Sequence, residues 1–319
     1  MGRPLWARLA RLVGHDVAPL DTGWIVQPAD EERRLQASRL GTGGGWLVHR
    51  GRPRKTVRVG GPEARSHLVV NERAARREMA RVQKDLSHYL AQEQVAWLLR
   101  ELDVNVVLDV GANVGQYARG LRGSGYRGRI VSFEPVSTLA AELRKAAAED
   151  PDWLVYDCAL GDEAATTEIN VARGPSRPAL VSSLLPSSDF GKSWSEKLRD
   201  MDRETITVRR LDSVFDDAVS GIDNPRVFLK MDTQGYDLRA FGGAGDVIDQ
   251  VLGLQSEVSC VPIYEGMPHL TEQLAVYEAA GFAPAGMFQV SRHRSSMRII
   301  EFDLMMVRAN AASSAEGVA

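Results

Sequence analysis

The chain has few cysteines, few lysines and no long apolar run. Its two cysteines among 319 residues, Cys158 and Cys260, are too few for a disulfide framework and lack the spacing of a zinc site. No apolar stretch approaches the roughly 18 residues that cross a bilayer. The start of the chain, MGRPLWARLARLVG, is basic but lacks the apolar segment of a secretory signal. We therefore expect a cytoplasmic protein without a transmembrane segment, and we predict no metal site.

Positive charge is concentrated near the start of the chain. Residues 1–90 hold 17 Arg or Lys against 9 Asp or Glu, whereas the remainder carries 22 against 33. A basic segment can contact an acidic partner or an anionic membrane surface, and it can also be an ordinary solvated surface. We interpret residues 1–70 as a basic extension containing a small hairpin subdomain. Residues 71–309 form the main domain, and the small residues of 310–319 predict a disordered tail.

The stretch VVLDVGANVGQY, residues 106–117, organises everything after residue 100. Val106, Val107, Leu108 and Val110 form a short β-branched apolar run, which is typical of a strand buried on both faces. Gly111 and Gly115 interrupt the run, since a tight turn at a strand end needs residues without Cβ. Asn113 between them tolerates the left-handed backbone region. A helical pattern resumes at Gln116, so free N–H groups would point at a ligand above the turn.

Such a turn has two functional interpretations. A dinucleotide-binding fingerprint requires glycine at the position that Asn113 occupies, because the backbone there meets a pyrophosphate. A nucleoside donor without pyrophosphate, S-adenosylmethionine, does not have this requirement. Glu134 lies 19 residues past Gly115 at the end of a second predicted strand, where an acid can accept hydrogen bonds from ribose hydroxyls. The sequence therefore favours S-adenosylmethionine.

The turn motif and several further motifs lie in order within residues 90–309. Together these motifs resemble those of FkbM-type methyltransferases. The resemblance implies a class I methyltransferase fold, an α/β Rossmann-like and mostly parallel sheet with helices on both faces, here preceded by the N-terminal extension. It also implies S-adenosylmethionine as cofactor and transfer to a hydroxyl oxygen, often on a sugar or other natural product. The motifs are DVGANVGQY at 109–117, SFEP at 132–135, ALGD at 159–162, SSLLP at 182–186, RRLDS at 209–213, LKMDTQGYDL at 229–238 and LQSEVSCVPIYEG at 254–266.

The candidate cofactor-binding residues come from the ends of the first three strands and from one later motif. Asp157 lies at the carboxyl end of the third predicted strand, residues 153–158, where its carboxylate can accept from an adenine amino group or cap the next turn. Ser183 lies in the SSLLP motif and either binds cofactor or caps a turn. The complete predicted set is Asp109, Gly111, Asn113, Gly115, Glu134, Asp157 and Ser183.

Methyl transfer needs few catalytic groups, because it is an in-line displacement in which the protein aligns the acceptor and removes its proton. Asp232 ends the fourth predicted strand, residues 227–231, and Glu257 lies near the end of the fifth, residues 252–258. His269 follows in a loop, and an imidazole has an ordinary pKa suited to base chemistry. We predict these three as the catalytic residues. Asp232 can instead hold the donor's ammonium group or a divalent metal.

Two alternatives remain at this stage. One is a nicotinamide-dependent oxidoreductase, which Asn113 disfavours, and the other is a binding module that keeps the fold without catalysis. Nucleic-acid methylation would favour an Asn/Asp-Pro-Pro-aromatic motif after the fourth strand, whereas this chain has Asp232-Thr-Gln-Gly. We expect the acceptor to be a small molecule or glycan, such as a sugar or glycolipid, with no nucleic-acid partner. The basic N-terminus can make peripheral membrane contact.

Overall fold

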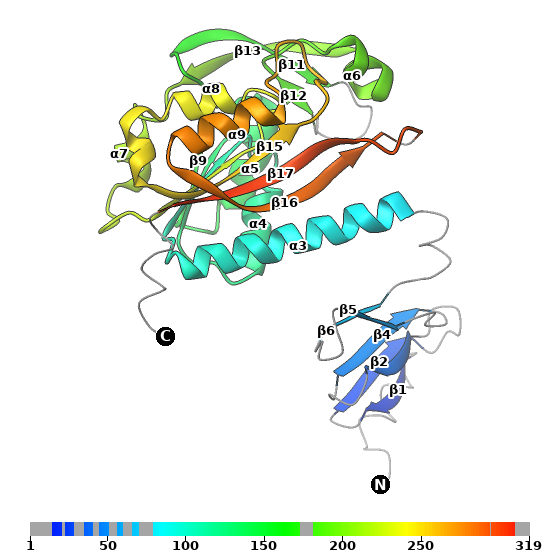
Figure 1. Cartoon of the computed structure of the whole chain (residues 1–319). Helices are drawn as coiled ribbons and strands as arrows, with labels where there is room; N and C mark the ends of the chain where they lie inside the picture. The colour runs from blue at the N-terminus through cyan, green and yellow to red at the C-terminus, as the bar shows by residue number, and fades with distance from the viewer. Residues whose placement is uncertain are drawn as a thin grey trace. The chain divides into compact units, whose positions relative to one another are not determined.

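A computed structural model shows the fold (Figure 1). It describes residues 15–20, 23–28, 35–40, 45–50, 56–59, 66–69, 79–172, 181–293 and 295–309. The chain divides into two compact units, Met1–Val82 and Gln83–Ala319. The predicted tail, 310–319, lies outside the described residues. Within the described ranges, no helix combines the length and apolar composition that a bilayer crossing requires.

The described residues of the first unit form three antiparallel strand pairs. The small hairpin subdomain expected within residues 1–70 stays a prediction. The strands are β1 (His15–Leu20), β2 (Gly23–Pro28), β3 (Leu35–Leu40), β4 (Gly45–Arg50), β5 (Thr56–Val59) and β6 (Ser66–Val69).

The second unit is built on a seven-stranded sheet. Its order is β16-β17-β15-β14-β7-β8-β9, and β17 alone runs antiparallel to its neighbours. The mostly parallel, doubly wound class I methyltransferase fold is therefore present as predicted. The strands are β7 (Val106–Val110), β8 (Arg129–Phe133), β9 (Trp153–Tyr156), β14 (Val227–Met231), β15 (Val251–Ser259), β16 (Phe282–Arg292) and β17 (Ile299–Arg308).

Helices cover both faces of this sheet, as parallel strands require. On one face, α3 (Met79–Glu101), α4 (Gln116–Gly123) and α5 (Ser137–Ala147) pack against alternate strand residues such as Val107 and Phe228. The opposite face carries α7 (Phe215–Val219), α8 (Asp237–Gly242) and α9 (Leu270–Ala279), which bury Leu108 and Leu229. Figure 1 shows α3 along one side of the sheet and α8 and α9 along the other.

A second sheet, which the sequence did not predict, lies beside the first along the chain. Its four strands have the order β10-β13-β11-β12, and Ile169, Ile206 and Val208 from it pack on α5 residue Leu139. The predicted third strand, residues 153–158, is in fact β9 alone, because the chain leaves the large sheet after Tyr156. The strands of the second sheet are β10 (Ala159–Leu160), β11 (Ala165–Ala172), β12 (Ser182–Ser183) and β13 (Met201–Arg209).

The segment between β12 and β13 is held against the loop after β15. It contains α6 (Asp189–Trp194), whose N-cap Ser188 donates its hydroxyl to the carbonyl of Pro262 at 2.9 Å. Leu198, Ile263 and Tyr264 form part of a small separate hydrophobic cluster. This cluster fixes the loop that follows β15 beside the carboxyl ends of the strands.

We predict that the central strands dominate the stability of the second unit. Leu108 has no exposed surface, so Leu108→Ala should lower the free energy of unfolding by about 2–5 kcal/mol through lost burial and a residual cavity. The same change at Leu90, which is 53% exposed on α3, should alter it by less than about 0.5 kcal/mol. Urea unfolding followed by circular dichroism measures both. Equal losses would contradict the assignment of the core.

Candidate functional site

The candidate site lies outside the carboxyl ends of β7 and β14. These strands pair in parallel, with Asp109 opposite Lys230 and Val110 opposite Met231, so they end at the same level. After β7 the chain turns through α4 to β8 on the other side, which makes this the point where the strand order reverses. Ligands of open α/β sheets bind at such a point.

The two glycines of the turn are needed for different structural reasons. Gly111 has φ 76°, and a Cβ placed on it would lie 2.1 Å from the carbonyl oxygen of Asp232. Gly115 has φ 81°, and its Cβ would lie 2.8 Å from the ring of Trp153. Asn113 also has positive φ, 52°. Gly111 therefore allows the turn to touch the end of β14, whereas Gly115 allows α4 to pack on β9.

Glu134 follows β8 and lies beneath the turn. One carboxylate oxygen accepts the N–H of Asn113 at 2.8 Å, and the other accepts that of Val136 at 2.9 Å. The residue is only 3% exposed, and burial raises its pKa to about 7 although both backbone bonds and the Lys230 ammonium oppose the shift. A carboxylate has about four acceptor positions, so two remain for ligand hydroxyls.

A pocket of about 660 Å³, including its open mouth, occupies this point. It brings together four predicted residues, Gly111, Asn113, Glu134 and Asp232. The complete lining is Gly111, Asn113, Gln116, Glu134, Pro135, Ala159, Leu160, Ile169, Ser182, Leu184, Asp232, Thr233, Gln234 and Tyr236.

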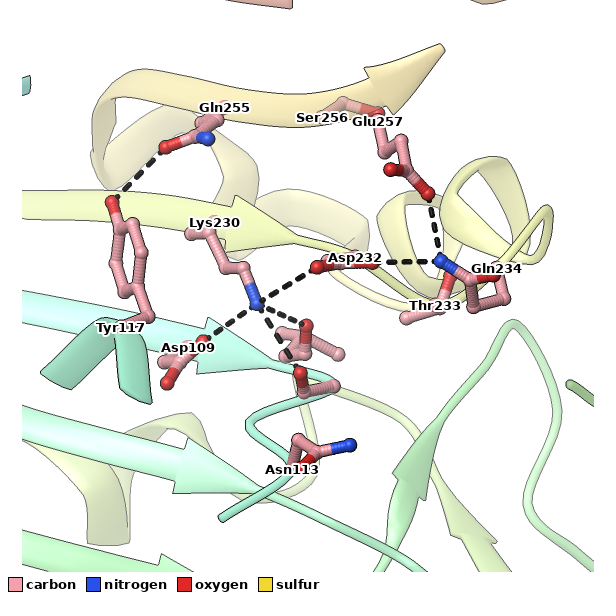
Figure 2. A network of polar contacts seen from close by, with 12 residues as sticks. Asp109, Asn113, Tyr117, Lys230, Asp232, Thr233, Gln234, Gln255, Ser256 and Glu257 are labelled. Atoms are coloured by element: carbon pink, nitrogen blue, oxygen red, sulfur yellow. Dashed lines mark hydrogen bonds and ion pairs between the residues drawn. The ribbon is translucent and has the colours of Figure 1, made fainter. Parts of the chain in front are cut away.

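Asp232 and Glu257 are joined through Gln234, as Figure 2 shows. The Gln234 amide nitrogen donates to Asp232 Oδ1 at 3.2 Å and to Glu257 Oε2 at 2.8 Å. Its amide oxygen accepts the hydroxyl of buried Tyr264 at 2.9 Å, which fixes the orientation of the amide. Gln234 has φ 54°, a conformation that is costly for a residue other than glycine. The surrounding bonds hold it there, and so fix the spacing of the two carboxylates.

Two more carboxylates lie beside Glu257 on the antiparallel pair β15 and β17. Asp303 pairs with Glu257 in register. Burial raises the pKa of Glu301 to about 7 and that of Asp303 to about 6, and burial and the neighbouring carboxylates raise the pKa of Glu257 well above its usual range. Among the described residues, no group of three or more His, Cys, Asp or Glu side chains is arranged to hold a metal ion.

Asp109 lies behind the turn and does not line the pocket. Its side chain has no exposed surface and forms a 2.9 Å ion pair with Lys230. Ser132 also donates its hydroxyl to Asp109 at 3.4 Å. Asp109, a predicted cofactor ligand, therefore supports the turn from behind through Lys230.

Three other predicted residues lie away from the pocket lining. Asp157 pairs with Arg144 where the chain leaves β9. Ser183 is buried, donating its hydroxyl to the Gln234 carbonyl at 2.7 Å and accepting the N–H of Leu185 at 3.0 Å. His269 is the N-cap of α9, with its ring accepting the N–H of Thr271 at 3.3 Å.

Several pocket residues were missed in the sequence analysis. Gln116, Gln234 and Tyr236 stood within or beside the quoted motifs, so their position after a strand end was an available signal. Leu184 likewise stood within the quoted SSLLP motif, whereas Ile169 had no such signal, since it reaches the pocket only through β11 of the unpredicted second sheet. Lys230 stood in the quoted LKMDTQGYDL motif but was given no role, although a lysine within a buried strand indicates a charged partner.

Comparison with known proteins identifies a family and a set of structural neighbours. A family model described as the methyltransferase FkbM domain matches residues 109–298, more than half of the chain. No curated protein sequence matches the chain.

The three solved structures described next are each similar to the chain at 12% identity or less. Magnesium protoporphyrin IX methyltransferase from Synechocystis PCC 6803, with bound SAM, is 12% identical with a TM-score of 0.39, covering 73% of this chain and 85% of its own. Aeropyrum pernix fibrillarin, in complex with S-adenosyl-L-methionine, is 10% identical with a TM-score of 0.34, covering 64% and 66%. A putative tRNA methyltransferase from Streptococcus pneumoniae, in complex with S-adenosyl-L-methionine, is 11% identical with a TM-score of 0.35, covering 64% and 66%.

The protonation of Glu134 gives a pH prediction for the cofactor that the sequence resemblance implies. Because its pKa is raised to about 7, the free protein carries a neutral carboxyl below that pH and an accepting carboxylate above it. The affinity for S-adenosylmethionine should therefore increase as pH rises from 6 to 8. Titration calorimetry measures it, and Glu134→Gln is the matched control because the ligand's own ionisation is common to both proteins. If the affinity of the Glu134→Gln variant for S-adenosylmethionine still increases with pH, the pH dependence belongs to another group.

Proposed function

The chain belongs to the FkbM-domain methyltransferase family, and from this premise we propose that it transfers a methyl group from S-adenosylmethionine to a hydroxyl oxygen of a sugar, glycolipid or other natural product. The observation that supports this most is the pocket between the turn after β7 and the end of β14. It has a buried carboxylate, Glu134, on one side and a half-exposed one, Asp232, on the other.

The pocket residues fit an adenosyl donor. Glu134 has free acceptor positions for two ribose hydroxyls, and the turn at Gly111 presents backbone rather than side chain. Asn113 replaces the glycine that a pyrophosphate requires. The family match also argues against the nicotinamide-dependent oxidoreductase. S-adenosylmethionine supplies a methyl group on a sulfonium, and the chain's own residues position that group and the acceptor.

Asp232 is our candidate for the residue that meets the acceptor. Its side chain is 42% exposed and lines the pocket at the end of β14, so an incoming hydroxyl can reach it. The hydroxyl must lose a proton as the new bond forms, and a carboxylate at this position can orient the hydroxyl and accept that proton. Gln234 holds the Asp232 oxygen in place during this step.

Glu257 and His269 have more distant places in the proposal. Glu257 contacts Gln234 rather than lining the pocket, and its raised pKa means that it takes up a proton more readily than an ordinary glutamate. We assign it support of Asp232. His269 caps α9 and is not part of the pocket lining. It remains the alternative base, with a ring that would have to leave its cap.

The preference for a hydroxyl acceptor rests on the family resemblance and on the few catalytic groups that the reaction needs. Incubation with labelled donor and a panel of sugars, glycolipids and polyketides tests the acceptor class. Methylation of RNA alone would overturn the assignment of a hydroxyl acceptor on a sugar, glycolipid or other natural product.

We assign the basic N-terminal residues to binding of the acceptor or a partner, because every donor motif lies after residue 105.

We predict that the protein binds S-adenosylmethionine and not NAD. Calorimetry with both ligands tests this at neutral pH. Glu134→Ala should weaken donor binding by about 1.5–3 kcal/mol, because charge-assisted hydrogen bonds to the ribose are lost. Tight NAD binding, or unchanged donor affinity in Glu134→Ala, would contradict the assignment of the pocket.

Turnover should separate Asp232 from His269. Asp232→Asn keeps the shape of the side chain but removes the accepting charge, so we expect a loss of about a hundredfold or more in turnover. His269→Asn keeps a good N-cap residue and removes the imidazole ring, so turnover should remain close to that of the wild type. Both are measured with labelled donor and the acceptor that the panel identifies. The reverse pattern would make His269 the base.

A further inference from the structure

Lys230 stands out as a buried cation where two strands separate. It is the one charged residue of β14, whose five residues are all buried. The side chain is 6% exposed, and its ammonium lies 2.9 Å from Asp109 Oδ1 and 3.8 Å from Asp232 Oδ2. Figure 2 shows this ammonium between the ends of β7 and β14, pointing at both carboxylates.

The same ammonium also contacts the backbone of the turn. It donates to the carbonyl oxygens of Gly111 at 3.2 Å and Val110 at 3.5 Å. The Val110 carbonyl in addition accepts the N–H of Asp232 at 3.0 Å. Gly111 also packs directly on the Asp232 carbonyl, so the Lys230 ammonium contacts the turn and the Asp232 side chain at the place where the two segments meet.

This cation is held in its charged form. Burial by itself would lower the pKa of Lys230, but the carboxylates of Asp109 and Asp232 more than offset that effect and raise the pKa above its usual value. The ring of Tyr117 adds a cation–π contact, with the ammonium 5.3 Å from its centroid. Lys230 itself is not among the residues that line the pocket.

We propose that Lys230 is a positioning residue, which holds the donor-binding turn and Asp232 at a fixed separation without touching the donor. The proposal rests on the proposed function, because it takes the pocket to be the donor site. The competing explanation is that Lys230 only neutralises buried Asp109. A buried ion pair can often be replaced by neutral residues without loss of stability, which allows the two to be separated.

The test uses the full chain with Lys230→Met, Asp109→Asn and the double variant that carries both changes. Thermal melting reports folding, and calorimetry gives the affinities for S-adenosylmethionine and S-adenosylhomocysteine. Each single variant leaves one buried group without its partner and should melt lower than the wild type. The double variant should melt close to the wild type, yet bind both ligands about tenfold more weakly, the equivalent of one lost charge-assisted hydrogen bond.

The two ligands distinguish geometry from charge. S-adenosylhomocysteine lacks the sulfonium charge, so a displaced turn weakens both ligands by the same factor. A change confined to S-adenosylmethionine would show that Lys230 acts only as a distant charge, and would overturn the proposal. Wild-type affinity for both ligands in a folded double variant would overturn it as well.

Lys230→Arg decides the matter if the double variant does not fold. It keeps the charge opposite Asp109, but the larger, planar guanidinium presents its donors in a rigid fork, unlike the compact ammonium that contacts both turn carbonyls. Weaker binding of both ligands by a common factor supports positioning, whereas wild-type affinity contradicts it. If the wild-type protein binds neither ligand, the proposed function fails, and the failure is visible before any variant is compared.

Discussion

The parallel pairing of β7 with β14 is the constraint on which the site depends. Because the two strands pair residue for residue from Val106 and Val227 to Val110 and Met231, the turn after one meets the end of the other. The backbone at position 111 lies so close to the Asp232 carbonyl that a side chain would not fit, and Gly111 has none. Asp109 and Lys230 lie opposite each other on the same two strands. The register of β7 with β14 therefore determines both the apolar packing of the strands and the ion pair behind the turn.

The pocket beside these strands has two chemically different sides, one formed by the end of β8 and the other by the end of β14. Glu134 on the β8 side is buried and held by backbone N–H groups, which suits a permanent contact with the donor. Asp232 on the β14 side is open to solvent and braced by Gln234, which suits an exchanging acceptor. The strained backbone of Gln234 is consistent with a functional position, because such conformations persist where the surroundings over-determine them.

Much of this arrangement could be predicted from the sequence, because short-range signals carry it. An apolar, β-branched run marked β7, a mostly apolar run marked β14, and an acid after β8 marked Glu134. The unpredicted parts depend on contacts between distant residues. Asp109 looked like a ligand because its partner, Lys230, lies 121 positions away in the sequence. Asp157 looked like the end of a strand because nothing local shows that the chain changes sheets after Tyr156.

A crystal structure of the protein with S-adenosylhomocysteine tests the central claim most directly. The account predicts the ribose hydroxyls within hydrogen-bonding distance of Glu134 and the homocysteine chain beside Gly111, with its sulfur directed toward Asp232. A ligand bound outside the pocket between β7 and β14, or one whose ribose contacts a residue other than Glu134, would contradict it.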